Sequence, residues 1–136
     1  MTETGPRWSI APYFIVDDVV ATAAFYRDKL GFKYERFWGD PPAFTMVYRS
    51  GIIIMLGQLA PTGTGGLTRP NGLAVPGDDC WDAYVWVDDA DALYEKFKAK
   101  GVHIARAICD QPYGCRDFDI VDPNSFRLCF GHNTET

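Results

Sequence analysis

The chain has 136 residues and a formal net charge of −5 at pH 7. The acidic charge argues against a nucleic-acid-binding protein, which needs a basic surface, and a hydrophobic content of 47% argues against a disordered chain. No apolar run approaches the ~20 residues of a membrane span, and residues 1–7 lack the basic start and apolar stretch of a signal peptide. We therefore expect one cytoplasmic domain, residues 1–136, with reduced cysteines.

The first half of the chain predicts a strand, a helix and three further strands. Residues 10–16 favour a strand, and Asp18 is a plausible N-cap for a helix that ends at Gly31. Apolar residues recur at helical spacing between Asp18 and Gly31. The three further strands are expected at residues 32–38, 44–49 and 52–57.

The second half of the chain repeats this plan. Val16-Asp17-Asp18, which precedes the first helix, recurs as Val87-Asp88-Asp89. A strand is expected over residues 82–87, and Asp88 or Asp89 caps a helix that ends at Gly101. The remaining strands are expected at residues 102–108, 116–121 and 126–130.

A duplicated βαβββ unit predicts an α+β fold in which two half-sheets curve toward each other and enclose a cleft. The first module is expected over about residues 8–57 and the second over about residues 81–131. Residues 58–80 are rich in Gly, Pro and Thr, and they form a linker that either has a role of its own or only tethers the modules. The modules could pair within one chain or across a dimer.

Two short motifs resemble the vicinal oxygen chelate superfamily. Residues 25–32, FYRDKLGF, resemble the FY...LGF helix end of that superfamily, and residues 122–125, DPNS, resemble its DPxG turn with Ser125 in place of Gly. The group includes glyoxalase I, extradiol dioxygenases, fosfomycin-resistance enzymes and bleomycin-resistance proteins. The resemblance covers about residues 10–130 and implies the glyoxalase/bleomycin-resistance fold.

A narrower similarity concerns residues 110–118, which resemble the segment EQPWG-REF of bleomycin-binding proteins, with Tyr113 in place of Trp. Such proteins sequester a cationic glycopeptide antibiotic in aromatic-lined clefts of a homodimer, without chemistry. This similarity implies a homodimer that binds a small molecule.

The resemblance to the superfamily also implies four metal-ligand positions, taken from the first and last strands of each module. These positions fall on Ala11, Met55, Asp82 and Cys129. Ala11 cannot bind a metal, the thioether of Met55 does not suit hard divalent ions, and Cys129 could bind zinc only as a thiolate. We therefore predict no metal and no cofactor, and we expect His103 and His132 on the solvated surface.

Strand alternation predicts which side chains line the cleft. If Ala83 and Val85 pack under the second helix, then Tyr84 and Trp86 face the cleft. The predicted ligand-binding residues are Tyr13, Trp38, Phe44, Met55, Asp82, Tyr84, Trp86, Tyr113, Arg127 and Cys129. Each aromatic residue could equally fill the core. The carboxylate of Asp82 should form an ion pair, with Arg127 as the candidate partner, become protonated, or await a cation.

These features predict a metal-independent small-molecule binding protein that sequesters an aromatic or cationic organic compound such as an antibiotic. No motif for a catalytic nucleophile is visible, and neither nucleic acid nor a membrane is expected as a partner. Two alternatives stay open: a divergent metal-dependent lyase, transferase or dioxygenase, and a structural or regulatory module whose cleft is filled by its own side chains.

Overall fold

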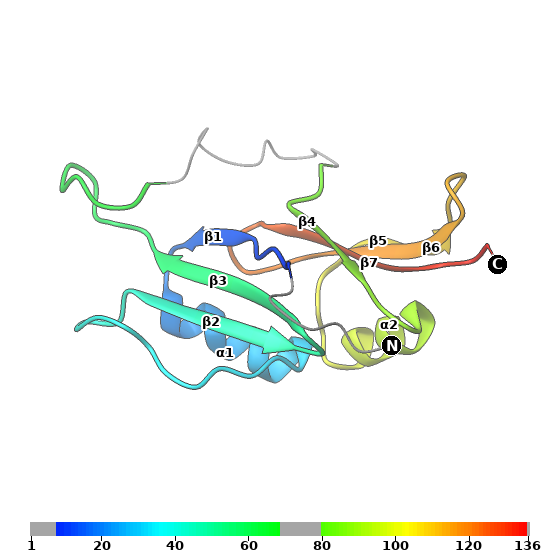
Figure 1. Cartoon of the computed structure of the whole chain (residues 1–136), viewed down its shortest axis with the longest axis horizontal. Coiled ribbons are helices and arrows are strands. Elements are labelled where there is room, and N and C mark those ends of the chain that lie inside the picture. Colours follow the sequence, from blue (N-terminus) through cyan, green and yellow to red (C-terminus); the bar gives the residue numbers. More distant parts are fainter. Residues whose placement is uncertain (1–7, 69–79, 136) are drawn as a thin grey trace.

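The computed structural model describes residues 8–68 and 80–135, which form two β-sheets with one helix each (Figure 1). The first half contains β1 (Tyr13–Val16), α1 (Val19–Leu30), β2 (Phe44–Arg49) and β3 (Ile52–Gln58). The second half contains β4 (Ala83–Trp86), α2 (Ala90–Ala99), β5 (Ile104–Asp110), β6 (Cys115–Val121) and β7 (Arg127–Asn133). The strand orders are β1-β3-β2 and β4-β7-β6-β5, so each sheet mixes one parallel pair with antiparallel pairs.

The predicted α+β class is confirmed, but the strand expected at residues 32–38 is wrong. Two isolated bridges replace it, Lys33 with Tyr48 and Trp38 with Phe44. Between these bridges the Arg36 carbonyl accepts a hydrogen bond of 2.7 Å from the Thr45 hydroxyl instead of from the β2 backbone. The first sheet therefore has three strands where the second has four.

Both helices begin where the sequence indicates, and α1 also ends there, whereas α2 ends at Ala99 with Lys100 as its C-cap, one residue before the expected Gly101. Asp18 has an extended backbone and its Oδ1 accepts the Ala21 amide at 3.0 Å, while Gly31 ends α1 with φ of 76°. Asp89, rather than Asp88, caps α2 through a bond of 3.1 Å from the Ala92 amide. Neither helix, nor any other among the described residues, is long and apolar enough to cross a membrane.

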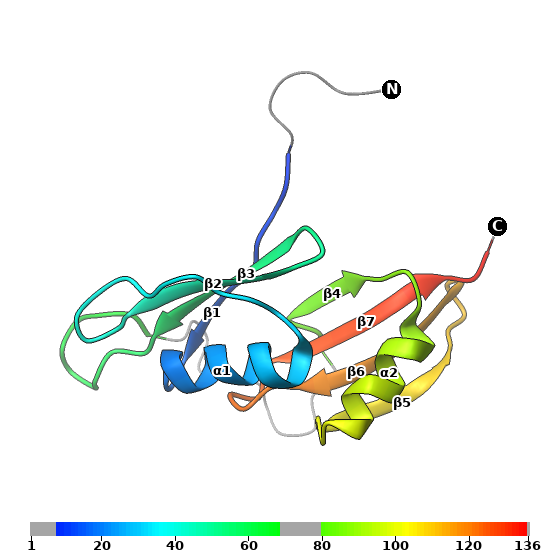
Figure 2. The ribbon, with the colours of Figure 1, turned by 90° about the horizontal axis from the view of Figure 1, so that it is seen from below.

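Both helices lie on the same side of the two sheets (Figures 1 and 2). Alternate strand residues point toward the helices and form one continuous core. Its strand residues include Phe14, Val16, Ile54 and Leu56 in the first half and Val85, Phe118, Leu128 and Phe130 in the second. No helix of residues 8–68 and 80–135 covers the opposite face of either sheet, and we call this face the open face.

The turn at residues 122–125 joins the two halves. The Tyr26 hydroxyl of α1 donates to Asp122 Oδ2 at 2.8 Å, and the Asn124 side-chain amide donates to Thr22 Oγ1 at 3.0 Å. All four groups are buried, so each would be costly to leave without a partner. Burial raises the pKa of Asp122 to about 6, even though Tyr26 and two backbone amides donate to its carboxylate.

Candidate functional site

The two open faces place equivalent residues at equivalent sheet positions. In the first sheet Met55 lies between Tyr13 and Met46, and in the second sheet Cys129 lies between Tyr84 and Asp119. The apolar wall, as we name the first open face, consists of Tyr13, Phe44, Met46, Ile53 and Met55. The charged wall, as we name the second, consists of Tyr84, Trp86, Asp117, Asp119, Arg127 and Cys129.

Each wall contains a tyrosine that lies flat over a glycine of the last strand. A Cβ atom on Gly57 would come within 2.5 Å of the Tyr13 hydroxyl oxygen, and a Cβ atom on Gly131 would collide with the Tyr84 hydroxyl. Only glycine leaves room for a ring at this distance. The two modules therefore share this packing as well as their topology.

Asp117 is the centre of a hydrogen-bonded network on the charged wall. Its side chain is fully buried, and it accepts the Tyr84 hydroxyl at 2.9 Å and the Tyr113 hydroxyl at 2.6 Å. Arg106 of β5 forms an ion pair with it at 2.5 Å, and Gln111 donates to it at 3.0 Å. Irregular pairing of β5 on both sides of Arg106 accompanies this approach of the guanidinium.

Asp119 is a second buried acid beside Asp117, and it too is neutralised. It pairs with Arg106 Nη2 at 2.9 Å and with Arg127 Nε at 2.7 Å, and the Trp81 indole donates to both of its oxygens at 3.2 Å. Of the alternatives for Asp82, the ion pair with the Arg127 guanidinium is not the one that the structure shows, since that guanidinium pairs with Asp119. Asp82 instead accepts the backbone amide of Arg127 at 2.7 Å, because its carboxylate lies beside the start of β7.

The network keeps the hydroxyl groups of Tyr84 and Tyr113 protonated. Burial and the hydrogen bond to Asp117 raise the pKa values of Tyr84 and Tyr113, so both hydroxyls stay protonated and donate to the acid. Burial alone would raise the pKa of Asp117, but the bonds from Tyr113, Arg106, Tyr84 and Gln111 outweigh it and lower the pKa. At neutral pH the charged wall thus holds two carboxylates balanced by two guanidinium groups.

Aromatic rings cover this network on the solvent side. Trp81 and Tyr84 lie 5.0 Å apart between ring centroids, Tyr84 and Trp86 lie 4.7 Å apart, and Trp81 and Tyr113 lie 6.4 Å apart. Trp86 is 64% exposed and Tyr113 is 51% exposed. We call these four residues the aromatic strip, and they offer flat apolar surface to a ligand.

The apolar wall has no comparable charge network among the described residues. Tyr13 packs edge-on against Phe44 at 5.9 Å, and Trp38 at the strand edge lies 5.7 Å from the same ring. The Arg36 guanidinium stacks over Trp38 at 4.5 Å. This wall can bury apolar groups but offers few polar contacts.

The four positions that the superfamily uses for metal do not fit a metal ion. Burial raises the pKa of the Cys129 thiol, so it stays protonated, and Asp82 already accepts a backbone amide. Within residues 8–68 and 80–135, no three His, Cys, Asp or Glu side chains form a group that could hold a metal. His103 is exposed, but the surface placement of His132 is wrong, because it is half-buried and accepts the Ala90 amide at 2.9 Å.

The structure divides the predicted ligand-binding residues between the two walls. Tyr13, Trp38, Phe44 and Met55 lie on or beside the apolar wall, while Tyr84, Trp86, Tyr113, Arg127 and Cys129 lie on or beside the charged wall. Asp82 lies at the edge of the second sheet, just before β4. Cys129 is fully buried beneath its neighbours, so its side chain offers no surface to a ligand.

Sequence reasoning missed the acids and their arginine partner. Asp117 and Asp119 alternate in β6 with Phe118 and Ile120, which are core residues, so the alternation rule already places both acids on the open face. Arg106 gave no such signal, because the irregular pairing of β5 interrupts its alternation. Met46, Trp81 and Gln111 were missed as well.

Comparison with known proteins gives one family and one fold. The family model described as Glyoxalase/Bleomycin resistance protein/Dioxygenase superfamily matches residues 9–130. No curated protein matches the chain in sequence.

Three solved structures illustrate the shared fold. The bleomycin resistance determinant encoded on transposon Tn5 superposes with a TM-score of 0.70 at 20% identity, covering 95% of this chain and 100% of that one. The bleomycin-binding protein from Streptomyces verticillus, complexed with copper(II)-bleomycin, gives 0.64 at 22% identity, covering 98% and 100%. A lactoylglutathione lyase from Agrobacterium tumefaciens gives 0.68 at 20% identity, covering 95% and 96%. The same fold therefore occurs in a bleomycin-binding protein, in a bleomycin resistance determinant and in a lyase.

Proposed function

The chain belongs to the glyoxalase/bleomycin resistance protein/dioxygenase superfamily, and we propose that it is a metal-independent protein that binds and sequesters an aromatic organic compound such as an antibiotic. The aromatic strip carries this proposal. Three of its four rings are more than 40% exposed, which is unusual for large apolar side chains in a folded protein. Exposed rings held in place from beneath form a preorganised surface for stacking.

The charge balance supports an aromatic ligand over a cationic one. A cationic ligand would need an acid that is free to receive it, but Asp117 and Asp119 already pair with Arg106 and Arg127. A further cation would meet a neutral network. The aromatic class is therefore better supported, and any positive charge on the ligand is secondary.

We further propose that two copies of the chain enclose the binding cleft. The helices cover one side of both sheets, so the apolar wall and the charged wall face the same way in one chain and do not oppose each other (Figure 2). Tyr13 and Ile53 on the apolar wall are 49% and 40% exposed. A second copy would cover these side chains and supply the opposite wall of the cleft. Size-exclusion chromatography with light scattering tests this assembly, and a monomer at high micromolar concentration would contradict it.

Tryptophan fluorescence tests ligand binding. We expect metal-free bleomycin and uncharged planar aromatic compounds to change the emission of the wild-type protein, and Trp86→Ala to weaken binding because a stacked ring is lost. Loss of one stacking partner predicts about a tenfold weaker Kd. Trp8→Phe is the matched control, since Trp8 is fully exposed and lies outside both walls. Unchanged emission across the panel, or equal affinity of Trp86→Ala and wild type, would contradict the proposal.

A further inference from the structure

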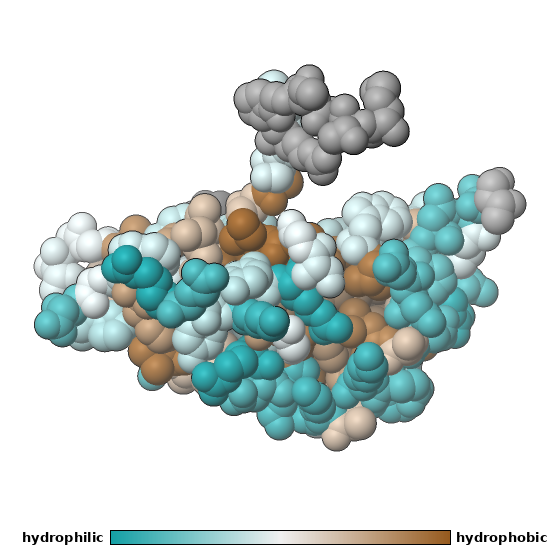
Figure 3. All heavy atoms as spheres, turned by 60° about the horizontal axis from the view of Figure 1, so that its bottom comes forward, coloured by the Kyte–Doolittle hydropathy of each residue, from teal (hydrophilic) through white to brown (hydrophobic). Residues whose placement is uncertain are grey.

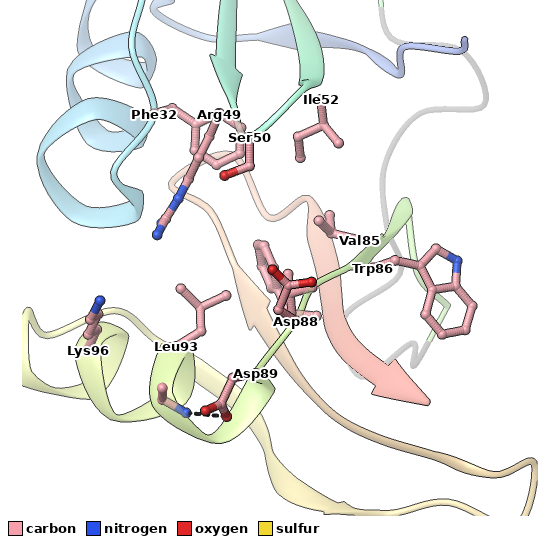
Figure 4. Close-up of a pocket in the computed structure, with 13 residues that line it drawn as sticks. Phe32, Arg49, Ser50, Ile52, Val85, Trp86, Asp88, Asp89, Leu93 and Lys96 are labelled. Carbon is pink, nitrogen blue, oxygen red and sulfur yellow. Dashed lines mark hydrogen bonds between the residues drawn. The ribbon is translucent and has the colours of Figure 1, made fainter. Parts of the chain in front are cut away.

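A cavity of about 340 Å³ opens on the helix side of the sheets, and it borders the charged wall at Trp86, which is one of its lining residues. It lies between the turn that joins β2 to β3 and the first two turns of α2, so each module supplies part of its lining (Figure 4). Its volume lies at the small end of the range for small-molecule sites. The close-up shows Trp86, which belongs to the charged wall, pointing away from the cavity.

The floor of the cavity is apolar. Phe32 and Ile52 come from the first module, and Val85, Leu93 and Phe130 come from the second. Figure 3 shows hydrophobic residues in the hollow between the two halves, with hydrophilic residues around it. An apolar ligand body would be buried here against side chains that already belong to the core.

One end of the cavity is cationic. Arg49 from β2 and Lys96 from α2 extend toward each other there, and the Ser50 hydroxyl lies beside Arg49 (Figure 4). Arg49 donates to the Leu30 carbonyl at 2.6 Å, but neither it nor Lys96 has an acidic partner among the described residues. Two cations and a hydroxyl at one end of an apolar cavity form a receptor for an anionic head group.

Two further lysines add positive charge near this end. Lys29 donates to the Lys100 carbonyl at 2.9 Å, and Lys100 donates to the Asp28 carbonyl at 3.2 Å. These bonds hold both ammonium groups where α1 and α2 end. The acidic residues of the cavity, Asp88 and Asp89, lie at the start of α2 instead, and Asp89 is occupied as its cap.

We propose that this cavity is a second binding site, distinct from the two walls, for a small apolar carboxylate. Its carboxylate lies between Arg49 and Lys96, and its alkyl or aryl body rests on Phe32, Ile52 and Leu93. The site does not depend on the aromatic strip or on a second copy of the chain. Because its lining comes from both modules, the ligand stabilises their packing against each other.

Methyl NMR with 4-phenylbutyrate as the probe tests this site. Ile52 lines the cavity while Ile53, the next residue, faces the apolar wall, so the two isoleucines report on the two sites separately. We expect shift changes at Ile52, Val85 and Leu93 and none at Ile53. The matched amine, 4-phenylbutylamine, should bind more weakly because it meets two cations. Changes confined to Ile53, no changes at millimolar probe, or equal binding of the amine would each overturn the proposal.

A pair of charge reversals on one helix completes the test. Lys96→Glu should weaken 4-phenylbutyrate binding about fivefold or more, as expected for replacing an attractive charge with a repulsive one. Lys98→Glu makes the same change outside the cavity, where Lys98 stacks on Tyr94, and should leave the affinity unchanged. Equal weakening by both variants would show a long-range charge effect and overturn the site. Neither result bears on ligand binding at the aromatic strip.

Discussion

The two walls show how one backbone arrangement supports opposite chemistry. Phe44 and Met46 of the apolar wall occupy the positions that Asp117 and Asp119 occupy on the charged wall, and each wall has its tyrosine over a glycine. The backbone therefore determines which sheet positions lie next to each other, and the side chains at those positions determine whether the surface is apolar or charged. This difference in side chains also explains why an arginine, Arg106, reaches only the charged wall. The two buried acids there need a positive charge, whereas Phe44 and Met46 do not.

The largest effect on the difference between the two walls is expected from removing the charge of Asp117. Asp117→Asn leaves Asp119 shared between two guanidinium groups, those of Arg106 and Arg127, so one buried positive charge loses its balance and we expect a loss of about 3 kcal/mol in the free energy of unfolding. Urea denaturation at pH 7 measures it. Phe44→Leu, at the matching position of the apolar wall, should cost about 1 kcal/mol or less because it keeps an apolar contact. Similar losses for both variants would mean that the network contributes no more than packing.

The pH dependence of stability concerns a further buried acid, Asp122, which forms no ion pair with any described residue. The pKa of Asp122 is raised from 3.8 to about 6, so its contribution to stability is greatest below pH 4 and falls as the pH rises through 6, by roughly 3 kcal/mol. The pKa of Asp117 is lowered, so its contribution is present above pH 4 and is lost as the pH falls through the lowered value.

Urea midpoints between pH 2.5 and 7 separate the two acids. Asp122→Asn should remove the pH dependence between 4 and 6, whereas Asp117→Asn should remove it only below 4. Titration of the Asp122 carboxyl carbon by NMR checks the first assignment directly. A midpoint below pH 4 for this carbon would contradict it.

A smaller effect is expected from adding one methyl group beneath each tyrosine. In Gly131→Ala the new Cβ lies 2.6 Å from Asp117 Cβ and against Tyr84, which is tied to that acid, so we expect a cost of about 2 kcal/mol. In Gly57→Ala the ring in the way belongs to Tyr13, which is half-exposed and whose hydroxyl bonds to no described residue, so about 1 kcal/mol is expected. Thermal unfolding of the two variants measures the difference. Equal costs would show that the network does not restrain Tyr84.

The smallest effect concerns single hydroxyl groups at the surface. Tyr113→Phe removes a bond of 2.6 Å to Asp117 and should cost about 1 kcal/mol. Tyr13→Phe removes a hydroxyl that bonds to no described residue, and it should change stability by less than about 0.5 kcal/mol. Denaturant titrations of the two variants, run side by side, provide the comparison. A larger loss for Tyr13→Phe would reverse the roles that we assign to the walls.

The sequence predicts the regular parts of this structure well, because periodicity and caps are local signals. Asp18, Gly31 and Asp89 mark helix ends through their own hydrogen bonds and backbone angles. The error at residues 32–38 has a tertiary cause. Apolar residues there suggested a strand, but Tyr34 and Phe37 pack against the core from an irregular segment that pairs with β2 only at its ends.

The candidate site was predicted in part. Alternation places Tyr84 and Trp86 on the open face, because it depends only on neighbours within one strand. The partners of each polar group could not be predicted, since the Arg127 guanidinium pairs with Asp119 on the neighbouring strand β6, whereas Asp82 accepts only the Arg127 backbone amide. The cavity on the helix side is set by the packing of one module on the other, and no local pattern in the sequence reports on it.

The turn at residues 122–125 has a consequence for the order of folding. It bonds to α1 through pairs that are 96 and 102 positions apart in the chain. During translation, α1 leaves the ribosome long before Asp122 and Asn124 are made, so Tyr26 and Thr22 can find these partners only near the end of synthesis. Such distant contacts close the largest loops and form late. The polar bonds between α1 and this turn, which hold the two modules together, are thus among those that form late.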